Sequence, residues 1–316
     1  MPELAVLDHD AVLAAVTPAE AIARVRAAFL EHHAGRWTMP AKLYLQSPPY
    51  GDFRAMPALG DGMAMLKWIA SFPGNPVAHG LPTVTGLVAL CDATTSVPRA
   101  LLDAVAVTAL RTGAVAAVAA RALAPPQART VGLIGCGVFG RWAARCLAAD
   151  GYGPGVCCDP RPEAAADLAA ELGWEAGDLR AALACDVVCS VTPGTQPVVT
   201  RADLRPGLHL TMLGADGPGK AEATLDAVAA CELFCDEWAQ ASHGGELTGA
   251  VEAGLVTRAQ VTDLGAVLAG VAPGRSSAHA VTLFDSTGLA IQDLAIALAC
   301  QAALDRGALS VPRVRL

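Results

Sequence analysis

Residues 131–140 read Val131-Gly132-Leu133-Ile134-Gly135-Cys136-Gly137-Val138-Phe139-Gly140, and this stretch decides the fold of the 316-residue chain. The apolar residues 131–134 predict a short buried strand, and residues 141–149 predict a helix. Between them, Gly135, Gly137 and Gly140 have the G-x-G-x-x-G spacing of a dinucleotide site. There the first glycine permits a tight turn, the second lets the backbone approach a pyrophosphate, and the third lets the helix pack on the strand.

A second short strand ends on Asp159, whose carboxylate is expected to accept hydrogen bonds from an adenosine ribose. With a strand before the glycines, a helix after them and this acid beyond, the sequence predicts a site for NAD. The alternative is a glycine turn of an α/β domain that binds no ligand.

Strand-like apolar runs recur at helix-sized intervals from residue 131 onward. They cover residues 131–134, 156–158, 186–191, 208–213, 231–235 and 281–284. Strands that alternate with helices form a parallel sheet, so we expect an α/β fold with a Rossmann-type doubly wound sheet.

The sequence before residue 131 has a different pattern of apolar and turn-forming residues. Thr17-Pro18-Ala19-Glu20 predicts the start of a helix that runs through Phe29. Residues 37–97 carry short apolar runs between frequent prolines and glycines, which predicts a mainly antiparallel sheet. A long helix is expected at 103–123, and an amphipathic helix at 288–306 is expected to return to this first domain. The predicted domains are 1–115 with 293–316, which is α+β, and 116–292, which binds the dinucleotide.

Composition excludes several classes of protein. The chain has 22 basic and 30 acidic residues, a formal charge of −8, which argues against a nucleic-acid partner. Arg111 and Arg121 interrupt the alanine-rich stretch 104–124, so no membrane span is expected. The ten cysteines form no C-x-x-C pair, which indicates a reducing cytoplasm, no disulfide framework and no structural metal.

Polar residues follow the predicted strands, where a parallel sheet binds its ligands. Thr192 follows the strand at 186–191, and the run Leu213-Gly214-Ala215-Asp216-Gly217-Pro218-Gly219-Lys220 follows the strand residues 209–212. The carboxylate of Asp216 is expected beside a nicotinamide, where it can serve as an acid or base. The alternative is that Asp216 caps the next helix or shapes the turn.

Four cationic residues stand in apolar surroundings. Lys42, Arg54 and Lys67 lie within apolar stretches of the first domain, and Arg111 interrupts the most apolar part of the long helix. Buried lysine and arginine need a partner, and a substrate carboxylate or a cofactor pyrophosphate would supply one. The alternatives are strand residues whose charges face solvent and, for Arg111, a salt bridge between helices.

Six stretches together carry a resemblance to a known family. They are 53–57 (FRAMP), 80–84 (GLPTV), 109–114 (ALRTGA), 214–220 (GADGPGK), 243–247 (HGGEL) and 284–293 (FDSTGLAIQD). Along nearly its whole length the chain resembles the ornithine cyclodeaminase/μ-crystallin family, and within it the archaeal-type alanine dehydrogenase branch most.

This resemblance implies a homodimer joined through its first, substrate-binding domains, a nicotinamide cofactor, and a 2-amino acid or its imine as substrate. It implies that Lys67 and Asp216 are catalytic. The implied substrate-binding residues are Lys42, Arg54, Lys67, Arg111 and Thr287. The implied cofactor-binding residues are Thr83, Arg111, Thr112, Gly135, Gly137, Val138, Phe139, Asp159, Thr192, Leu213, Gly214, Ala215, Lys220 and Ser286.

Two departures from the family pattern bear on the cofactor geometry. Val138-Phe139 stands where Ala-Gln is usual, which replaces a polar cofactor contact with an aromatic ring. Thr211 stands where an asparagine is usual.

The expected activity is that of an NAD-dependent oxidoreductase at the C–N bond of a small amino acid, such as alanine and water to pyruvate and ammonia, reversibly. Alternatives are a reductase of cyclic ketimines such as pyrroline-2-carboxylate, an ornithine or lysine cyclodeaminase, and a μ-crystallin-like binder without activity. Arg54 argues against a second substrate amine, because like charges about 4 Å apart repel by roughly 4 kcal/mol at an effective dielectric constant near 20.

Overall fold

The computed structural model describes residues 3–194, 196–217 and 219–315. The chain divides into two compact units: Met1–Arg111 with Leu289–Leu316, and Thr112–Gly288. The expected boundaries, after residue 115 and before residue 293, lie four residues further along the chain than these.

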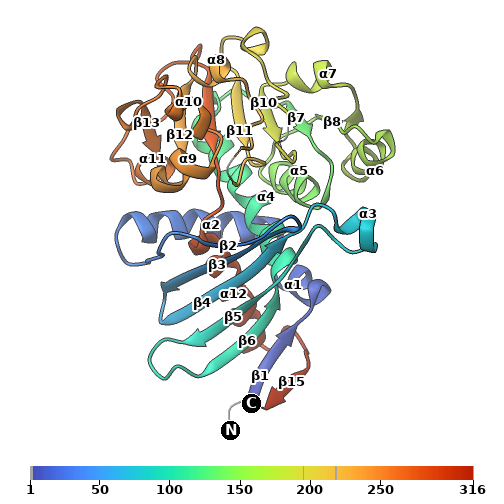
Figure 1. Cartoon of the computed structure of the whole chain (residues 1–316), viewed down its shortest axis with the longest axis vertical. Helices are drawn as coiled ribbons and strands as arrows, with labels where there is room; N and C mark the ends of the chain where they lie inside the picture. The colour runs from blue at the N-terminus through green and yellow to red at the C-terminus, as the bar shows by residue number, and fades with distance from the viewer. Residues whose placement is uncertain (1–2, 195, 218, 316) are drawn as a thin grey trace. The chain divides into compact units, whose positions relative to one another are not determined.

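The first unit is built on a seven-stranded sheet (Figure 1). In spatial order its strands are β15 (Arg313–Arg315), β1 (Glu3–Leu7), β6 (Pro98–Asp103), β5 (Val84–Asp92), β4 (Met63–Ser71), β3 (Gly51–Gly60) and β2 (Leu43–Ser47). Only the β1–β6 pair among these neighbours is parallel, so the expected mainly antiparallel sheet is present. The pairing of β1 with β15 places the two ends of the described chain side by side.

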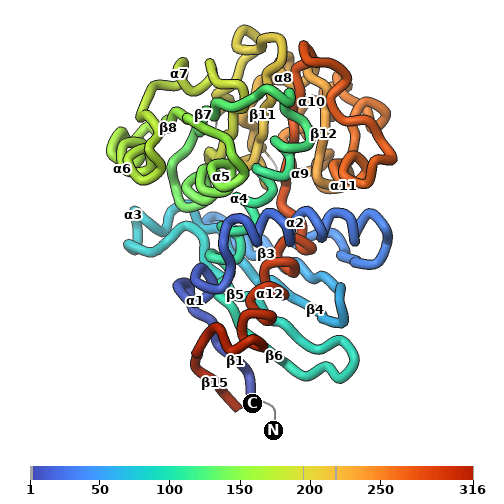
Figure 2. The backbone as a smooth tube through the Cα atoms, turned by 180° about the vertical axis from the view of Figure 1, so that it is seen from behind, coloured from blue at the N-terminus to red at the C-terminus, as the bar shows by residue number. Residues whose placement is uncertain are grey.

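Helices cover one face of this sheet. They are α1 (His9–Ala15), α2 (Pro18–His33) and α12 (Ala290–Asp305), with the short α3 (Asn75–His79) in the β4–β5 connection. Thr17 caps α2 as expected, because its hydroxyl accepts a hydrogen bond from the Glu20 amide at 3.2 Å. In the view from behind, α2 and α12 lie across the strands together (Figure 2).

Helix α12 returns to the first unit as predicted, but its expected amphipathic character is wrong. Eleven of its sixteen residues are buried, because the helix packs against α2 as well as against β3 and β4. A helix covered on several sides carries apolar residues all round.

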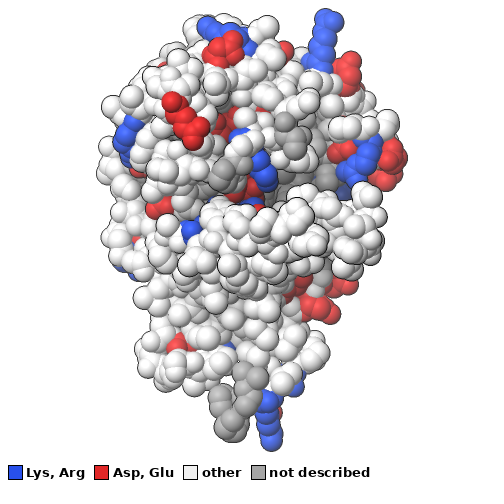
Figure 3. All heavy atoms as spheres, in the orientation of Figure 1, with Lys and Arg blue, Asp and Glu red and all other residues white. Residues whose placement is uncertain are grey.

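The other face of the first sheet is apolar and exposed. Strand alternation sends Met56, Met65 and Val88 to the core and their neighbours outward. The outward side chains include Leu43 at 60% exposure and Leu45 at 54%. Leu59, Leu66 and Leu87 on β3, β4 and β5 are also exposed, and few charged side chains lie over these strands (Figure 3).

The second unit contains an eight-stranded sheet whose described pairs are all parallel. In spatial order its strands are β13 (Val261–Asp263), β12 (Glu232–Cys235), β14 (Thr282–Asp285), β11 (His209–Met212), β10 (Val187–Ser190), β7 (Val131–Ile134), β8 (Gly155–Cys158) and β9 (Glu175–Ala176). All six predicted strands are present, and the edge strands β9 and β13 were not foreseen. The α/β, Rossmann-type fold is confirmed.

Helices and short 3-10 turns connect these strands. They are α5 (Val138–Ala149), α6 (Pro162–Leu172), α7 (Leu179–Leu183), η1 (Arg201–Asp203), α8 (Leu225–Val228), α9 (Trp238–Gly244), α10 (Thr248–Glu252), η2 (Arg258–Gln260) and α11 (Leu264–Leu268). Strand β7 has β8 on one side and β10 on the other, so the chain changes direction across the sheet there. Ligands of open α/β sheets bind at the carboxyl ends of strands at such a point.

The long predicted helix is α4 (Ala104–Leu123). Contrary to expectation, it is long and apolar enough to cross a membrane by length and composition. However, 83% of its most apolar window is buried inside the protein, which is typical of a core helix.

Candidate active site

The glycine loop of the second unit has the geometry of a dinucleotide cradle. Gly135 adopts φ +96°, and a Cβ there would lie 2.5 Å from the Val191 carbonyl oxygen. A Cβ on Gly140 would lie 1.8 Å from the Gly135 carbonyl oxygen, so both positions require glycine for internal reasons. A Cβ on Gly137 would meet no atom within 4 Å. The open space at Gly137 fits the close approach of a ligand instead.

The helix that follows the loop adds an anion-binding end. Gly137 is the N-cap of α5, and no side chain caps it. Helix N-termini with unpaired amides attract phosphate groups. Val138 in the first turn is 54% exposed, so the residue that departs from the family pattern is open to solvent at this end.

Asp159 lies at the end of β8, next to the glycine loop. Its carboxylate accepts hydrogen bonds from the Cys136 amide at 2.7 Å and from the Arg161 amide at 2.9 Å. The Arg161 guanidinium pairs with it at 3.1 Å. Burial opposes ionisation of Asp159, but the hydrogen bonds from Arg161 and Cys136 outweigh it and lower its pKa. An ionised acid is therefore fixed beside the loop, where it can accept further hydrogen bonds.

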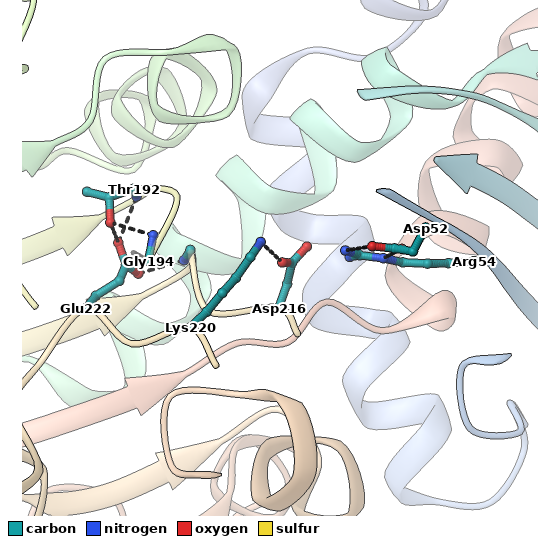
Figure 4. Close-up of polar contacts among 8 residues, drawn as sticks. Asp52, Arg54, Thr192, Gly194, Asp216, Lys220 and Glu222 are labelled. Carbon is teal, nitrogen blue, oxygen red and sulfur yellow. Dashed lines mark hydrogen bonds and ion pairs between the residues drawn. The ribbon is translucent and has the colours of Figure 1, made fainter. Parts of the chain in front are cut away.

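A buried glutamate joins the next two strand ends (Figure 4). The Glu222 carboxylate accepts hydrogen bonds from the Thr192 amide and hydroxyl, both at 2.7 Å, and from the Gly214 amide at 2.6 Å. The Ser190 hydroxyl donates a further one at 2.5 Å. Burial raises the pKa of Glu222, and these donors oppose that rise. The sequence analysis did not identify Glu222, which holds two predicted cofactor residues in place.

A second glutamate supports the first. Glu246 is buried and accepts hydrogen bonds from the Glu222 amide at 2.8 Å and the Ala223 amide at 2.6 Å. Its pKa is raised to about 7, mainly by burial and also by the charge of Glu222. It lies in the 243–247 stretch that carried the resemblance, but its burial could not be read from the sequence.

An aspartate that follows β12 holds the turn that contains the predicted residues Ser286 and Thr287. Asp236 accepts hydrogen bonds from both hydroxyls, at 3.2 Å each, and from the Gly288 amide at 2.9 Å. Asp285 is fully buried, and its pKa is raised well above its usual value by burial and by neighbouring acids, first of all Asp236.

Asp216 lies in the turn after β11, which also contains Pro218, a position outside the described residues. The Lys220 ammonium is 2.6 Å from the Asp216 carboxylate, and about a third of each side chain is exposed (Figure 4). The helix-cap alternative for Asp216 is wrong, because the next helix, α8, begins at Leu225 with Thr224 as its N-cap. Asp216 is thus placed where a proton donor or acceptor remains accessible.

Thr211, the other residue that departs from the family pattern, has a structural role. Its hydroxyl shares a hydrogen bond of 3.0 Å with His209 Nε2, and His209 Nδ1 is 2.8 Å from the Thr282 hydroxyl. Burial lowers the pKa of His209 to about 3, which keeps the ring neutral in this chain of hydrogen bonds between β11 and β14.

In the first unit, two of the cationic residues are buried rather than solvent-facing. Arg54 is 8% exposed and Lys67 is 1% exposed, so the solvent-facing alternative is wrong for both. Arg54 pairs with Asp52 at 2.6 Å (Figure 4). Lys42 is partly buried before β2.

Lys67 has a partner that the sequence analysis missed. We expected a substrate carboxylate to neutralise a buried ammonium, but the Lys67 Nζ is 2.6 Å from the Asp293 carboxylate on α12. The same carboxylate is 3.5 Å from Nε of Arg111 on α4, which is a salt bridge between helices, as one alternative held. Burial lowers the pKa of Lys67 to about 7, and the charge of Asp293 opposes this.

The remaining predicted cofactor-binding residues are Thr83, Thr112, Phe139, Leu213 and Ala215. Thr83 is partly exposed before β5, and its carbonyl accepts a hydrogen bond from the Phe72 amide at 2.7 Å. The Thr112 hydroxyl on α4 is buried and has no hydrogen-bond partner among the described residues. Leu213 and Ala215 are buried, and Phe139 is partly buried in the first turn of α5.

The part of the chain that the structure describes contains no group of three or more His, Cys, Asp or Glu side chains that could hold a metal ion. Its ten cysteines are free.

The chain is similar to several known proteins. The sequence model of the ornithine cyclodeaminase/mu-crystallin family matches residues 3–305. The alanine dehydrogenase of Archaeoglobus fulgidus is 39% identical over 302 residues, 93% of each protein. The structure of an archaeal alanine dehydrogenase dimer with bound NAD gives a TM-score of 0.94 at 36% identity over all of both chains. Thermococcus litoralis Δ1-pyrroline-2-carboxylate reductase, in complex with NADH and L-proline, gives 0.91 at 26% identity, covering 99% of this chain and 100% of the other.

Proposed function

The chain belongs to the ornithine cyclodeaminase/mu-crystallin family, and we propose that it is an NAD-dependent oxidoreductase acting on the C–N bond of a small 2-amino acid. The direction written for alanine gives pyruvate and ammonia from the amino acid and water, reversibly. The observation that carries this proposal is Lys67, an ammonium buried in a chain whose second unit has a dinucleotide cradle. Buried ionisable side chains whose pKa is lowered or raised by their surroundings cluster at active sites.

The second unit would hold the cofactor. Its glycine loop and the N-terminus of α5 suit a pyrophosphate, and Asp159 suits the 2′-hydroxyl of NAD. Thr192, Gly214 and Ser286 lie in turns fixed by Glu222 and Asp236, so they would meet the cofactor without rearrangement. Bound NAD supplies the hydride acceptor, and NADH the hydride donor.

The first unit would hold the substrate. Lys42, Arg54 and Arg111 are its candidate partners for the substrate carboxylate, which would orient the α-carbon. The protonated Lys67 would polarise the carbonyl or imine, since a cation stabilises the negative charge that develops on its oxygen or nitrogen. Asp216 would give or take the proton of the amine or water, and Thr287 would contact the substrate.

Reduction of a cyclic imine is the second candidate. The similarity to a pyrroline-2-carboxylate reductase extends over 99% of this chain, and the same groups would serve that reaction. A cyclodeaminase needs room for a second amine. The repulsion expected from Arg54 is weaker than the sequence implied, because Asp52 neutralises that guanidinium at 2.6 Å.

We also propose that the chain forms a homodimer through the exposed face of the first sheet and resides in the cytoplasm. Leu43, Leu45, Leu59, Leu66 and Leu87 are exposed apolar side chains on the same face of β2 to β5. Exposed apolar patches of this kind mark protein interfaces. The archaeal alanine dehydrogenase of similar structure is a dimer.

A substrate panel tests the proposed reaction. The protein is mixed with NADH, ammonium and a series of 2-oxo acids, and in parallel with NADH and cyclic imino acids, while NADH absorbance is followed. Consumption of NADH with pyruvate and ammonium supports the dehydrogenase, and consumption with the cyclic imine alone supports the reductase. Binding of NADH without turnover of any substrate in either direction would contradict an enzymatic role.

A further inference from the structure

Asp293 is the most deeply buried charge of the first unit. It lies in the first turn of α12, its side chain is 0% exposed, and it faces two cations at once. Its carboxylate is 2.6 Å from Nζ of Lys67 and 3.5 Å from Nε of Arg111. An acid buried this completely persists only when cations compensate its lost hydration.

The surroundings of Lys67 show what this carboxylate does. Among the described residues, the charged groups that act on Lys67 most strongly are Asp293 on α12, Arg111 on α4 and Lys42 before β2. Two of the three are cations and favour loss of the proton, as burial does. Thr108 on α4 is a weaker neighbour, with its hydroxyl 3.4 Å from Nζ. Asp293 is therefore the group that opposes deprotonation.

We propose that Asp293 is a positioning residue. It keeps Lys67 protonated and fixes the position of the Lys67 ammonium, so that the ammonium can polarise the substrate carbonyl or imine. The inference rests on the proposed catalytic role of Lys67. Lys67 and Arg111 together carry one positive charge more than the Asp293 carboxylate between them, which suits a substrate carboxylate. A counter-ion of a lysine that takes no part in turnover would affect stability but not the pH dependence of kcat.

The test is the pH profile of the Asp293→Asn variant. For the wild type and D293N, kcat for reduction of the preferred 2-oxo acid or imine by NADH is measured from pH 6 to 10. In the alkaline limb of the profile, kcat falls as pH rises. We expect this fall to occur roughly one to three pH units lower in D293N than in wild type, because the loss of an opposite charge at this distance usually lowers the pKa of an ammonium by that amount. The KM for the substrate should change much less than kcat. Free ammonia rises with pH equally in both assays, so the difference between the profiles reports on the enzyme.

Control variants separate positioning from folding. Ile296→Val trims another buried residue of α12 and should lower thermal stability slightly without moving the limb. Asp293→Glu keeps the charge but displaces it by one methylene, so its limb should stay within about half a pH unit of wild type while kcat falls. The proposal would be overturned if D293N folds and its kcat falls at the same alkaline pH as that of wild type. If D293N does not fold, an unchanged kcat in D293E would overturn it.

A measurement without turnover distinguishes this inference from the proposed function. At a pH below the pKa that Lys67 has in the folded protein, its side chain is charged in both the folded and the unfolded state, and burial of the charge destabilises the fold. At a pH above that pKa, the unfolded chain binds one more proton than the folded protein, so the free energy of unfolding rises with pH. In wild type this rise should begin near pH 7, and in D293N it should begin lower. A lower onset in a protein that turns over no substrate would support the role of Asp293 and reject the proposed function. The same onset in both proteins would reject the role.

Discussion

Replacing Lys67 by methionine should both abolish turnover and destabilise the first unit. The sequence alone predicts only the loss of turnover, because methionine keeps the apolar stem of the lysine side chain. The structure adds that the ammonium neutralises Asp293, which is fully buried 2.6 Å away. Removal of one partner of a buried ion pair costs about 3–5 kcal/mol. Arg111 remains 3.5 Å from the carboxylate, so we expect the lower end, about 3 kcal/mol. At roughly 3–4 °C per kcal/mol for a unit of this size, the melting temperature should fall by about 10 °C.

Thermal unfolding at pH 7 and the NADH absorbance assay measure the two effects. The matched control is the double variant Lys67→Met with Asp293→Asn, which removes both charges and should regain most of the lost stability but no activity. A melting temperature of K67M equal to wild type would refute the energetic reasoning, as would a double variant less stable than K67M. Retained turnover of K67M at saturating substrate would refute the catalytic assignment.

Four further outcomes are expected. Asp216→Asn should lower kcat by about 10²–10⁴-fold and leave NADH binding nearly unchanged, and wild-type turnover would make Asp216 a turn residue only. The ratio of kcat/KM values should favour NADH over NADPH, because the Asp159 carboxylate repels a 2′-phosphate, and the opposite ratio would reject that role. Burial holds the pKa of Glu246 near 7, above its usual 4.5, so the folded protein keeps a proton that the unfolded chain loses. The free energy of unfolding measured in urea should therefore fall as pH rises from 4.5 to 7, and this fall should be smaller in Glu246→Gln. Leu66→Glu on the exposed sheet face should convert a dimer to monomers in gel filtration, and an unchanged elution volume would place the interface elsewhere.

The second unit was largely predictable because its central strands are buried on both faces. Strands of that kind are uninterrupted apolar runs, such as Val131–Ile134, and turn glycines mark where they end. The edge strand β9 has only the residues Glu175-Ala176, both exposed, so it carries no hydrophobic signal. Strand β13 spans three residues, of which only Val261 is apolar and buried, so its hydrophobic signal is too short to predict a strand. Their pairing is supplied by neighbouring strands rather than by their own sequence.

The residues of the predicted site were identifiable by type and position, but the acids that hold them were not. Glu222, Asp236 and Asp285 each lie in or beside a loop at the end of a strand, where an acid is ordinarily solvated. Their burial depends on backbone amides and hydroxyls contributed by other loops, as the Thr192 and Gly214 contacts to Glu222 illustrate. An acid directly after an apolar strand, as in Phe284-Asp285, is the signal that was available.

The pairing of Lys67 with Asp293 shows how far such reasoning can extend. A lysine within Met65-Leu66-Lys67-Trp68 must have an anion if it is buried, but the sequence does not say which one. The prediction that the last helix returns to the first unit narrows the choice, because α12 contains two acids, Asp293 and Asp305. Asp293 lies in the apolar run and Asp305 at the helix end. A charge inside an apolar helix requires a buried counter-charge, so the two residues could have been assigned to each other from topology and burial together.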